Sequence, residues 1–214
     1  MNTLDNAVNA YIESLIKERS DLLKEMETFA EKENVPIMEL AGIETLLQLL
    51  RIQKPKRILE IGTAIGYSGL RMAEALPDTE IVTIERDEAR YQQALNFVGR
   101  SPQKDQLDII FGDALEKVPE VEGKGPFDAL FIDAAKGQYQ KFFDLYAPLL
   151  TDEGVVYSDN VLFKGMVAEE EVENKRIRQM VKKLKSYNDW LMNHPEYNTV
   201  IIPVGDGIAV SRKK

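Results

Sequence analysis

Residues 57–69 read Arg-Ile-Leu-Glu-Ile-Gly-Thr-Ala-Ile-Gly-Tyr-Ser-Gly, an apolar run that passes directly into a glycine-rich turn. Glycines at a strand-to-helix turn let a ligand approach the backbone, and the helix N-terminus favours negative charge. The spacing G-x-x-x-G-x-x-G differs from the dinucleotide fingerprint G-x-G-x-x-G, and the Gly-Lys-Ser/Thr ending of a P-loop is missing. The stretch therefore predicts a strand–turn–helix unit that binds a ligand, with another nucleotide or a purely structural turn as the alternatives.

Short apolar runs alternate with helical stretches beyond this turn. Strands are expected at residues 57–61, 80–85, 106–111, 129–132 and 154–158, with helices at 67–76, 87–98, 136–147 and 174–192. This alternation predicts a mostly parallel sheet with helices on both faces. Two later runs, 199–204 and 208–212, flank Gly205-Asp206-Gly207, which predicts an antiparallel hairpin. The expected fold is α/β, a Rossmann-like seven-stranded sheet ending in that hairpin, as is typical of class I methyltransferases.

The first part of the chain has helical periodicity. Apolar residues at spacings of three, four or seven predict one helix over residues 4–30 with a single apolar stripe: Leu4, Val8, Tyr11, Leu15, Leu22, Met26 and Phe29. A second helical pattern covers residues 37–50, after Pro36. We interpret residues 1–35 as a helical extension of one domain, 1–214, and expect its apolar surface to help form a homodimer.

Composition excludes several classes of site and partner. The 214 residues include no cysteine and one histidine, which excludes disulfides, sulfur-based zinc sites and histidine-rich metal sites. No stretch approaches the ~20 apolar residues that cross a bilayer, and no secretory signal is recognisable, so we expect a cytoplasmic protein without a membrane partner. The net charge of -9 argues against a surface that binds polyanions over its whole extent, and no DNA partner is expected.

Three acidic residues lie at, or just beyond, the carboxyl ends of the first three predicted strands. Glu60 beside the glycine turn would repel a pyrophosphate but suits an amino-acid ammonium group, which favours S-adenosylmethionine. Glu85 ends the second strand, where a carboxylate can accept hydrogen bonds from ribose hydroxyls; the alternative is a solvated acid. Asp113-Ala114 follow the third strand, where an adenine edge would lie, although Asp113 could instead cap a helix.

The sharpest signal lies at the ends of the next two strands. Asp133 ends the fourth strand, and Asp159-Asn160 end the fifth. The carboxyl ends of parallel strands meet at one edge of the sheet, so these side chains should converge. Two carboxylates and an amide oxygen suit Mg²⁺, with Mn²⁺ or Ca²⁺ as competitors. Helix capping by these residues is the alternative.

Lys136 follows Asp133 by three residues. A lysine beside a divalent cation could take a hydroxyl proton or stabilise an oxyanion. The alternative is a solvent-exposed lysine in the first turn of a helix.

Together, residues 60–68, Glu85, Asp113, 133–136 and 159–160 resemble the metal-dependent O-methyltransferases of the catechol and caffeoyl-CoA type. The resemblance runs from about Pro36 to the C-terminus, and within the family it is strongest to bacterial tRNA 5-hydroxyuridine methyltransferases. It implies that Asp133, Asp159 and Asn160 bind Mg²⁺, and that Lys136 and Asp133 are catalytic. It also implies these S-adenosylmethionine contacts: Met38, Glu60, Gly62, Ser68, Glu85, Asp113, Ala114 and Asp133.

The resemblance leaves the methyl acceptor open. A catechol and a 5-hydroxyuracil both offer two adjacent oxygens, so a metal site explains either. We expect 5-methoxyuridine formation at the wobble position of a tRNA anticodon loop, aided by outward basic residues on the 174–192 helix: Lys175, Arg176, Arg178, Lys182, Lys183 and Lys185. The acidic run 169–171 would repel the phosphates of an RNA and argues against this acceptor. The alternatives are a small catechol-like or hydroxycinnamoyl acceptor, although the 162–174 stretch is shorter than the plant insertion, and a non-catalytic nucleotide-binding module.

Overall fold

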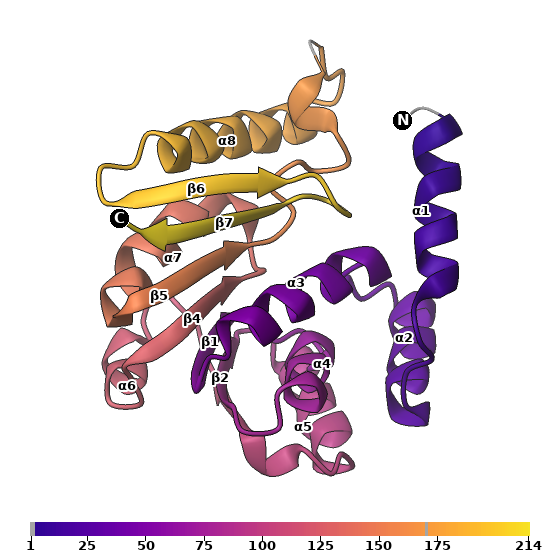
Figure 1. Ribbon diagram of the computed structural model, residues 1–214, viewed down its shortest axis with the longest axis vertical. Coiled ribbons are helices and arrows are strands. Elements are labelled where there is room, and N and C mark those ends of the chain that lie inside the picture. The colour runs from indigo at the N-terminus through magenta and orange to yellow at the C-terminus, as the bar shows by residue number, and fades with distance from the viewer. Residues whose placement is uncertain (1–2, 170) are drawn as a thin grey trace.

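The computed structural model describes residues 3–169 and 171–214; for residues 3–6 it describes the backbone only. One sheet has the strand order β3-β2-β1-β4-β5-β7-β6 (Figure 1). Strands β1 to β5 are parallel, and β7 runs antiparallel to both β5 and β6. The strands are β1 Arg57–Ile61, β2 Glu80–Glu85, β3 Leu107–Phe111, β4 Phe127–Ile132, β5 Leu150–Ser158, β6 Tyr197–Ile202 and β7 Ile208–Lys213. The predicted fold is confirmed.

Helices cover both faces of the sheet because the strand residues alternate between two apolar layers. Ile58 and Phe131 pack with α3 and α4, whereas Leu59 and Leu130 pack with α7 and α8. The helices are α1 Thr3–Leu15, α2 Asp21–Glu33, α3 Leu40–Gln53, α4 Tyr67–Ala75, α5 Glu88–Gly99, α6 Val118–Glu122, α7 Tyr139–Tyr146 and α8 Lys175–Met192. Within the described residues, no helix has the length and apolar character needed to span a membrane.

The single helix predicted over residues 4–30 is wrong, because α1 ends at Leu15 and α2 begins only at Asp21. Ser20 caps α2 by accepting a hydrogen bond from the Leu23 amide at 3.4 Å. The apolar stripe divides at this break. Met26 on α2 is fully buried, whereas Tyr11 and Leu15 on α1 are both 65% exposed. Leu4, at the start of the stripe, has its side chain outside the described residues.

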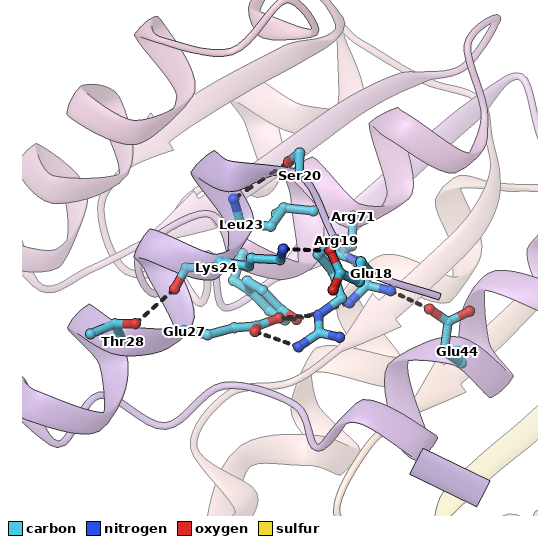
Figure 2. Close-up of polar contacts among 10 residues, drawn as sticks. Glu18, Arg19, Ser20, Leu23, Lys24, Glu27, Thr28, Glu44 and Arg71 are labelled. Carbon is cyan, nitrogen blue, oxygen red and sulfur yellow. Dashed lines mark hydrogen bonds and ion pairs between the residues drawn. The ribbon is translucent and has the colours of Figure 1, made fainter. Parts of the chain in front are cut away.

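A network of charged and hydroxyl groups holds α2 against α3 and α4 (Figure 2). Arg19 donates to both carboxylate oxygens of Glu27 at 2.8 Å, and the Tyr67 hydroxyl donates to Glu27 at 2.6 Å. Arg71, only 5% exposed, donates to the Tyr67 hydroxyl at 2.9 Å and pairs with Glu44. Because Tyr67 directly follows the glycine turn, this network places the segment between α2 and α3 beside that turn.

Candidate active site

The glycine turn after β1 lies directly against the end of β4. Gly62 has a φ of 110°, and a Cβ there would lie 2.0 Å from the carbonyl oxygen of Asp133. Any larger residue would therefore push the two strand ends apart. The turn is held to β2 by the Gly62 and Thr63 amides, which donate to the Ile84 carbonyl at 3.1 and 3.2 Å.

A cavity of about 300 Å³ opens at the carboxyl ends of β1, β2, β4 and β5. Most of the candidate residues line it: Met38, Gly62, Glu85, Asp113, Ala114, Asp133, Lys136, Asp159 and Asn160. Residues 36–38, between α2 and α3, form one wall. The cavity also includes Arg86, Arg90, Gln138 and Phe142, which the sequence analysis did not single out. Phe142 could not be separated from the ordinary apolar face of its helix by spacing alone.

Glu60 and Ser68 lie beneath the glycine turn and do not line the cavity. The Glu60 side chain has no exposed surface. Ser68 Oγ donates to Glu60 Oε1 at 2.5 Å, and Thr83 Oγ1 donates to Oε2 at 2.6 Å. Burial raises the pKa of Glu60 to about 7, although both hydrogen bonds oppose the rise. These contacts tie the end of β1 to β2 and α4. Direct cofactor contact by Glu60 and Ser68 stays a prediction.

Glu85 and Asp113 are fixed in the cavity wall by backbone amides. Glu85 accepts from the Ala64 amide and from the Asp87 amide, both at 2.8 Å. Asp113 accepts from the Leu115 amide at 2.9 Å, which closes a turn two residues on. Helix α6 begins only at Val118, so Asp113 caps a turn rather than a helix. Both carboxylates are therefore held in place before any ligand binds.

Asp133, Asp159 and Asn160 meet where β4 and β5 end. The Asp159 amide donates to the Ile132 carbonyl at 3.0 Å, which keeps the two strand ends in register. Asn160 has a φ of 56°, a left-handed conformation that asparagine tolerates better than most residues. Its Nδ2 donates to Asp159 Oδ2 at 2.9 Å, and its Oδ1 accepts from Lys136 Nζ at 2.5 Å. The four predicted residues thus form one group.

The electrostatics of this group suit a cation. Burial raises the pKa of Asp133 to about 6, opposed by the positive charge of Lys136. Burial and the charge of Asp133 raise the pKa of Asp159 well above its usual range. The buried carboxylate of Asp159, the half-buried carboxylate of Asp133 and an amide oxygen are hard ligands that fit Mg²⁺ chemistry. In residues 3–169 and 171–214, no group of three or more acidic, histidine or cysteine residues is placed to hold a metal, so the amide is the candidate third ligand.

Lys136 begins a single 3₁₀ turn, Lys136–Gln138, that leads into α7. Its side chain is half-buried, and its Nζ lies 5.8 Å from the centroid of the Phe163 ring. The segment carrying Phe163 is braced by the hairpin turn between β6 and β7. The Leu162 amide donates to the Asp206 carbonyl at 2.8 Å, and the Lys164 amide donates to Asp206 Oδ1 at 3.1 Å. Lys136 therefore lines the cavity, and its ammonium lies beside a segment that the C-terminal hairpin braces.

A sheet of this topology, with a glycine turn and acidic strand ends around one cavity, can be compared with known families. The O-methyltransferase family model matches residues 13–214. The chain belongs to the O-methyltransferase family. It is accordingly an S-adenosylmethionine-dependent O-methyltransferase. A catechol O-methyltransferase from Niastella koreensis is 32% identical over 174 residues, which cover 79% of each chain. A flavonoid 3',5'-methyltransferase from Vitis vinifera is 30% identical over 187 residues, 84% of this chain and 78% of the relative.

Solved O-methyltransferases have the same fold and include cofactor complexes. A provisional caffeoyl-CoA O-methyltransferase from Staphylococcus aureus has a TM-score of 0.92 and 39% identity, covering 97% of this chain and 100% of that one. The O-methyltransferase TomG from Streptomyces achromogenes, solved with S-adenosylmethionine, has a TM-score of 0.84 and 25% identity over the whole of both chains. These likenesses support the cofactor class expected from the glycine turn.

Proposed function

We propose that this enzyme methylates a hydroxyl group of a small aromatic molecule with two adjacent oxygens, using a divalent metal ion held by Asp133, Asp159 and Asn160. Mg²⁺ is the expected ion, with Mn²⁺ or Ca²⁺ as competitors. The observation that carries the proposal is the convergence of two carboxylates, an amide oxygen and Lys136 in one cavity. The names of the relatives above, which refer to catechol, a flavonoid and caffeoyl-CoA, support a phenolic acceptor.

The proposed metal ligands and Lys136 have different roles in the reaction. A bound divalent ion would lower the pKa of an acceptor hydroxyl and orient its oxygen. Lys136 Nζ takes the hydroxyl proton or stabilises the oxyanion, while the acceptor oxygen forms a bond to the methyl carbon. The carbon–sulfur bond breaks and leaves a neutral thioether. Holding the two reactants in line supplies much of the rate gain.

The cofactor would lie over β1 to β3. Glu85 is placed to accept the ribose hydroxyls, and Asp113 with Ala114 lies at the adenine edge. Met38 covers the cavity from the segment between α2 and α3, and Gly62 lets the ligand approach the backbone. Glu60 and Ser68 would support this site from beneath, with direct contact to the amino-acid part still a prediction.

A tRNA anticodon loop is the second candidate acceptor, and one observation favours it. The six basic residues of α8 are all exposed, as predicted. A Cβ placed on Gly137 would lie 3.1 Å from Lys183 Nζ, so this cation lies beside the turn that begins with Lys136. Exposed cations beside this turn could bind the phosphates of an RNA backbone. The relatives named above point to small phenolic acceptors instead, so we rank tRNA second.

Methyl transfer from labelled S-adenosylmethionine tests both acceptors. We expect transfer to catechol or caffeoyl-CoA, loss of transfer with EDTA and recovery on adding Mg²⁺. A 5-hydroxyuridine-containing anticodon stem-loop serves as the competing acceptor. Transfer to the stem-loop alone would contradict the phenolic proposal, and undiminished transfer in EDTA would contradict the metal. The Lys183→Ala variant should lower transfer to the acceptors that carry phosphates, the stem-loop and caffeoyl-CoA. Transfer to catechol should be unchanged.

The exposed apolar face of α1 supports a second proposal, that the protein forms a homodimer through its N-terminal extension. Val8, Tyr11, Ile12 and Leu15 are between 41% and 65% exposed. Figure 1 shows α1 extending beyond the sheet and its covering helices. Sedimentation of the wild type and of the Leu15→Asp variant tests this proposal. We expect a dimeric wild type and a monomeric variant. A monomeric wild type would contradict it.

A further inference from the structure

The hydroxyl of Tyr139 is buried without a hydrogen-bond partner. The residue is 1% exposed, and among the described residues only Asn188 Oδ1 is a second buried side-chain atom without a partner. Leaving a buried donor unpaired costs about 1–3 kcal/mol. A phenylalanine would fill nearly the same space without this cost, so the hydroxyl needs an explanation.

The position of Tyr139 ties it to the candidate metal ligands. It is the first residue of α7, directly after the 3₁₀ turn that carries Lys136. Its ring packs edge-on against Tyr187, with centroids 5.5 Å apart. The Tyr187 hydroxyl is in turn 2.7 Å from Ser158 Oγ, in the residue before Asp159. Tyr139 therefore connects through Tyr187 to the end of β5, next to Asp159.

The charges of both carboxylates act on the Tyr139 hydroxyl. Burial, and then the negative charges of Asp133 and Asp159, raise the pKa of Tyr139 well above its usual range, so the phenol keeps its proton. The Ala134 amide opposes this rise but lies outside hydrogen-bonding geometry. An N–H group could only donate to the phenol oxygen, so the phenol proton has no acceptor in either case.

We propose that Tyr139 is a positioning residue of the metal site, whose hydroxyl donates a hydrogen bond to the Asp133–Asp159 carboxylate pair when the cation is bound. This inference rests on the proposed function. Carboxylates that bind metals are themselves oriented by hydrogen bonds, and loss of such a partner typically weakens metal binding 10–100-fold. Tyr139 is well placed for this role because its ring is fixed by packing and its proton is unused.

Mn²⁺ binding to the full-length Tyr139→Phe variant, with S-adenosylhomocysteine present, tests the inference. The free ion is measured by its electron paramagnetic resonance signal. We expect the Kd for Mn²⁺ to rise about 10-fold or more. The melting temperature of the metal-free variant should be unchanged or higher, because an unpaired buried hydroxyl has been removed.

A matched control is Tyr157→Phe. The Tyr157 hydroxyl donates to Gln53 Oε1 at 2.9 Å, and its ring packs on the opposite face of the sheet, with α3. This variant should melt at a lower temperature and bind Mn²⁺ like the wild type. Asp159→Ala, which removes a proposed ligand, marks the signal expected when the site is lost.

The outcomes separate this inference from the proposed function. An Mn²⁺ Kd for Tyr139→Phe equal to that of the wild type overturns the positioning role and leaves the metal site intact. A lower metal-free melting temperature with unchanged Mn²⁺ binding also overturns it, because the hydroxyl would then serve packing alone. A wild type that binds no Mn²⁺ overturns the metal-dependent function, and the inference with it.

Discussion

The proposed cofactor half of the site has Glu60 beneath the cavity and Glu85 in its wall, and the proposed metal half has Asp133 and Asp159. The two halves differ in how their carboxylates are hydrogen-bonded. In the cofactor half, both oxygens of Glu60 and both oxygens of Glu85 accept hydrogen bonds from protein donors. In the metal half, and within the described residues, one side-chain donor reaches Asp159 and none reaches Asp133. Buried carboxylates are costly unless they are paired. Protein donors thus satisfy the first pair of carboxylates, whereas the second pair keeps oxygens that a cation could neutralise.

The Asp159→Ala substitution breaks the metal half and should have the largest effect. We expect the rate of methyl transfer to fall at least about 10³-fold, because metal activation supplies several kcal/mol of transition-state stabilisation. Calorimetric binding of S-adenosylhomocysteine should be nearly unchanged, since the cofactor half is intact. Asp152→Ala, at an exposed acid on the same strand, is the control. Near-normal turnover of Asp159→Ala would exclude metal-activated transfer.

The Lys136→Ala substitution tests the proton acceptor beside the metal ligands. The rate at neutral pH should fall about 10²-fold, as is usual for loss of a general base. The deficit should shrink as pH rises, because solvent hydroxide then removes the proton. The measurement is a pH–rate profile, with the exposed Lys141→Ala on α7 as the control. A deficit of constant size at every pH would contradict a role as base.

The Glu85→Gln substitution perturbs the proposed cofactor half. A glutamine has only one acceptor oxygen, so the Ala64 and Asp87 amides cannot both keep their partners. We expect S-adenosylmethionine affinity to fall about 10-fold, equivalent to roughly 1.4 kcal/mol. The rate at saturating cofactor should change little. Glu80→Gln, at the opposite and exposed end of β2, is the control. Unchanged affinity for the cofactor would remove Glu85 from the binding site.

The Asp159→Asn substitution should stabilise the metal-free protein while destroying the metal site. The folded pKa of Asp159 is raised, so the folded state binds a proton more tightly than the unfolded chain. Its contribution to stability is therefore present at low pH and lost as pH rises through the folded pKa. The contribution of Asp133 to stability is likewise lost as the pH rises through its folded pKa of about 6. At pH 8 the variant should melt a few degrees higher, at about 2–4 °C for each kcal/mol.

This gain should shrink as the pH falls toward the ordinary pKa of an aspartate, because Asp159 is then neutral in the wild type as well. Thermal melts across the pH range, with EDTA present, measure it. Glu85→Gln should show no comparable gain, since its carboxylate is already paired with amides. A lower melting temperature for Asp159→Asn at pH 8 would mean that the carboxylates of the metal half are also satisfied without a cation.

Much of the fold and of the proposed metal half could be predicted from the order of apolar runs and helical stretches along the chain. Apolar runs separated by helical stretches predict parallel strands, and the carboxyl ends of such strands meet. The convergence of Asp133, Asp159 and Asn160 follows from strand order alone. The break between α1 and α2 could not be seen, because residues 16–20 contain no proline or glycine and the apolar spacing continues across them.

Side-chain pairing was beyond the reach of the sequence. The acidic position of Glu60 suggested a ligand contact, but only the structure shows that Ser68 and Thr83 occupy both of its oxygens. Tyr139 could not be identified from the sequence, because nothing in a sequence distinguishes a paired phenol from an unpaired one. Such properties depend on which atoms meet across the fold rather than on local pattern.

The strand order also has a consequence for how the enzyme is made. Strand β7 lies between β5 and β6, so it pairs on both edges with strands that are synthesised before it. Until it emerges, β6 has no neighbour to pair with, and the segment carrying Phe163 lacks its anchor on Asp206. The glycine turn and the first five strands can assemble earlier in synthesis. A nascent chain should therefore form its proposed cofactor half first, and fix the Phe163 segment beside Lys136 only after the hairpin has been translated.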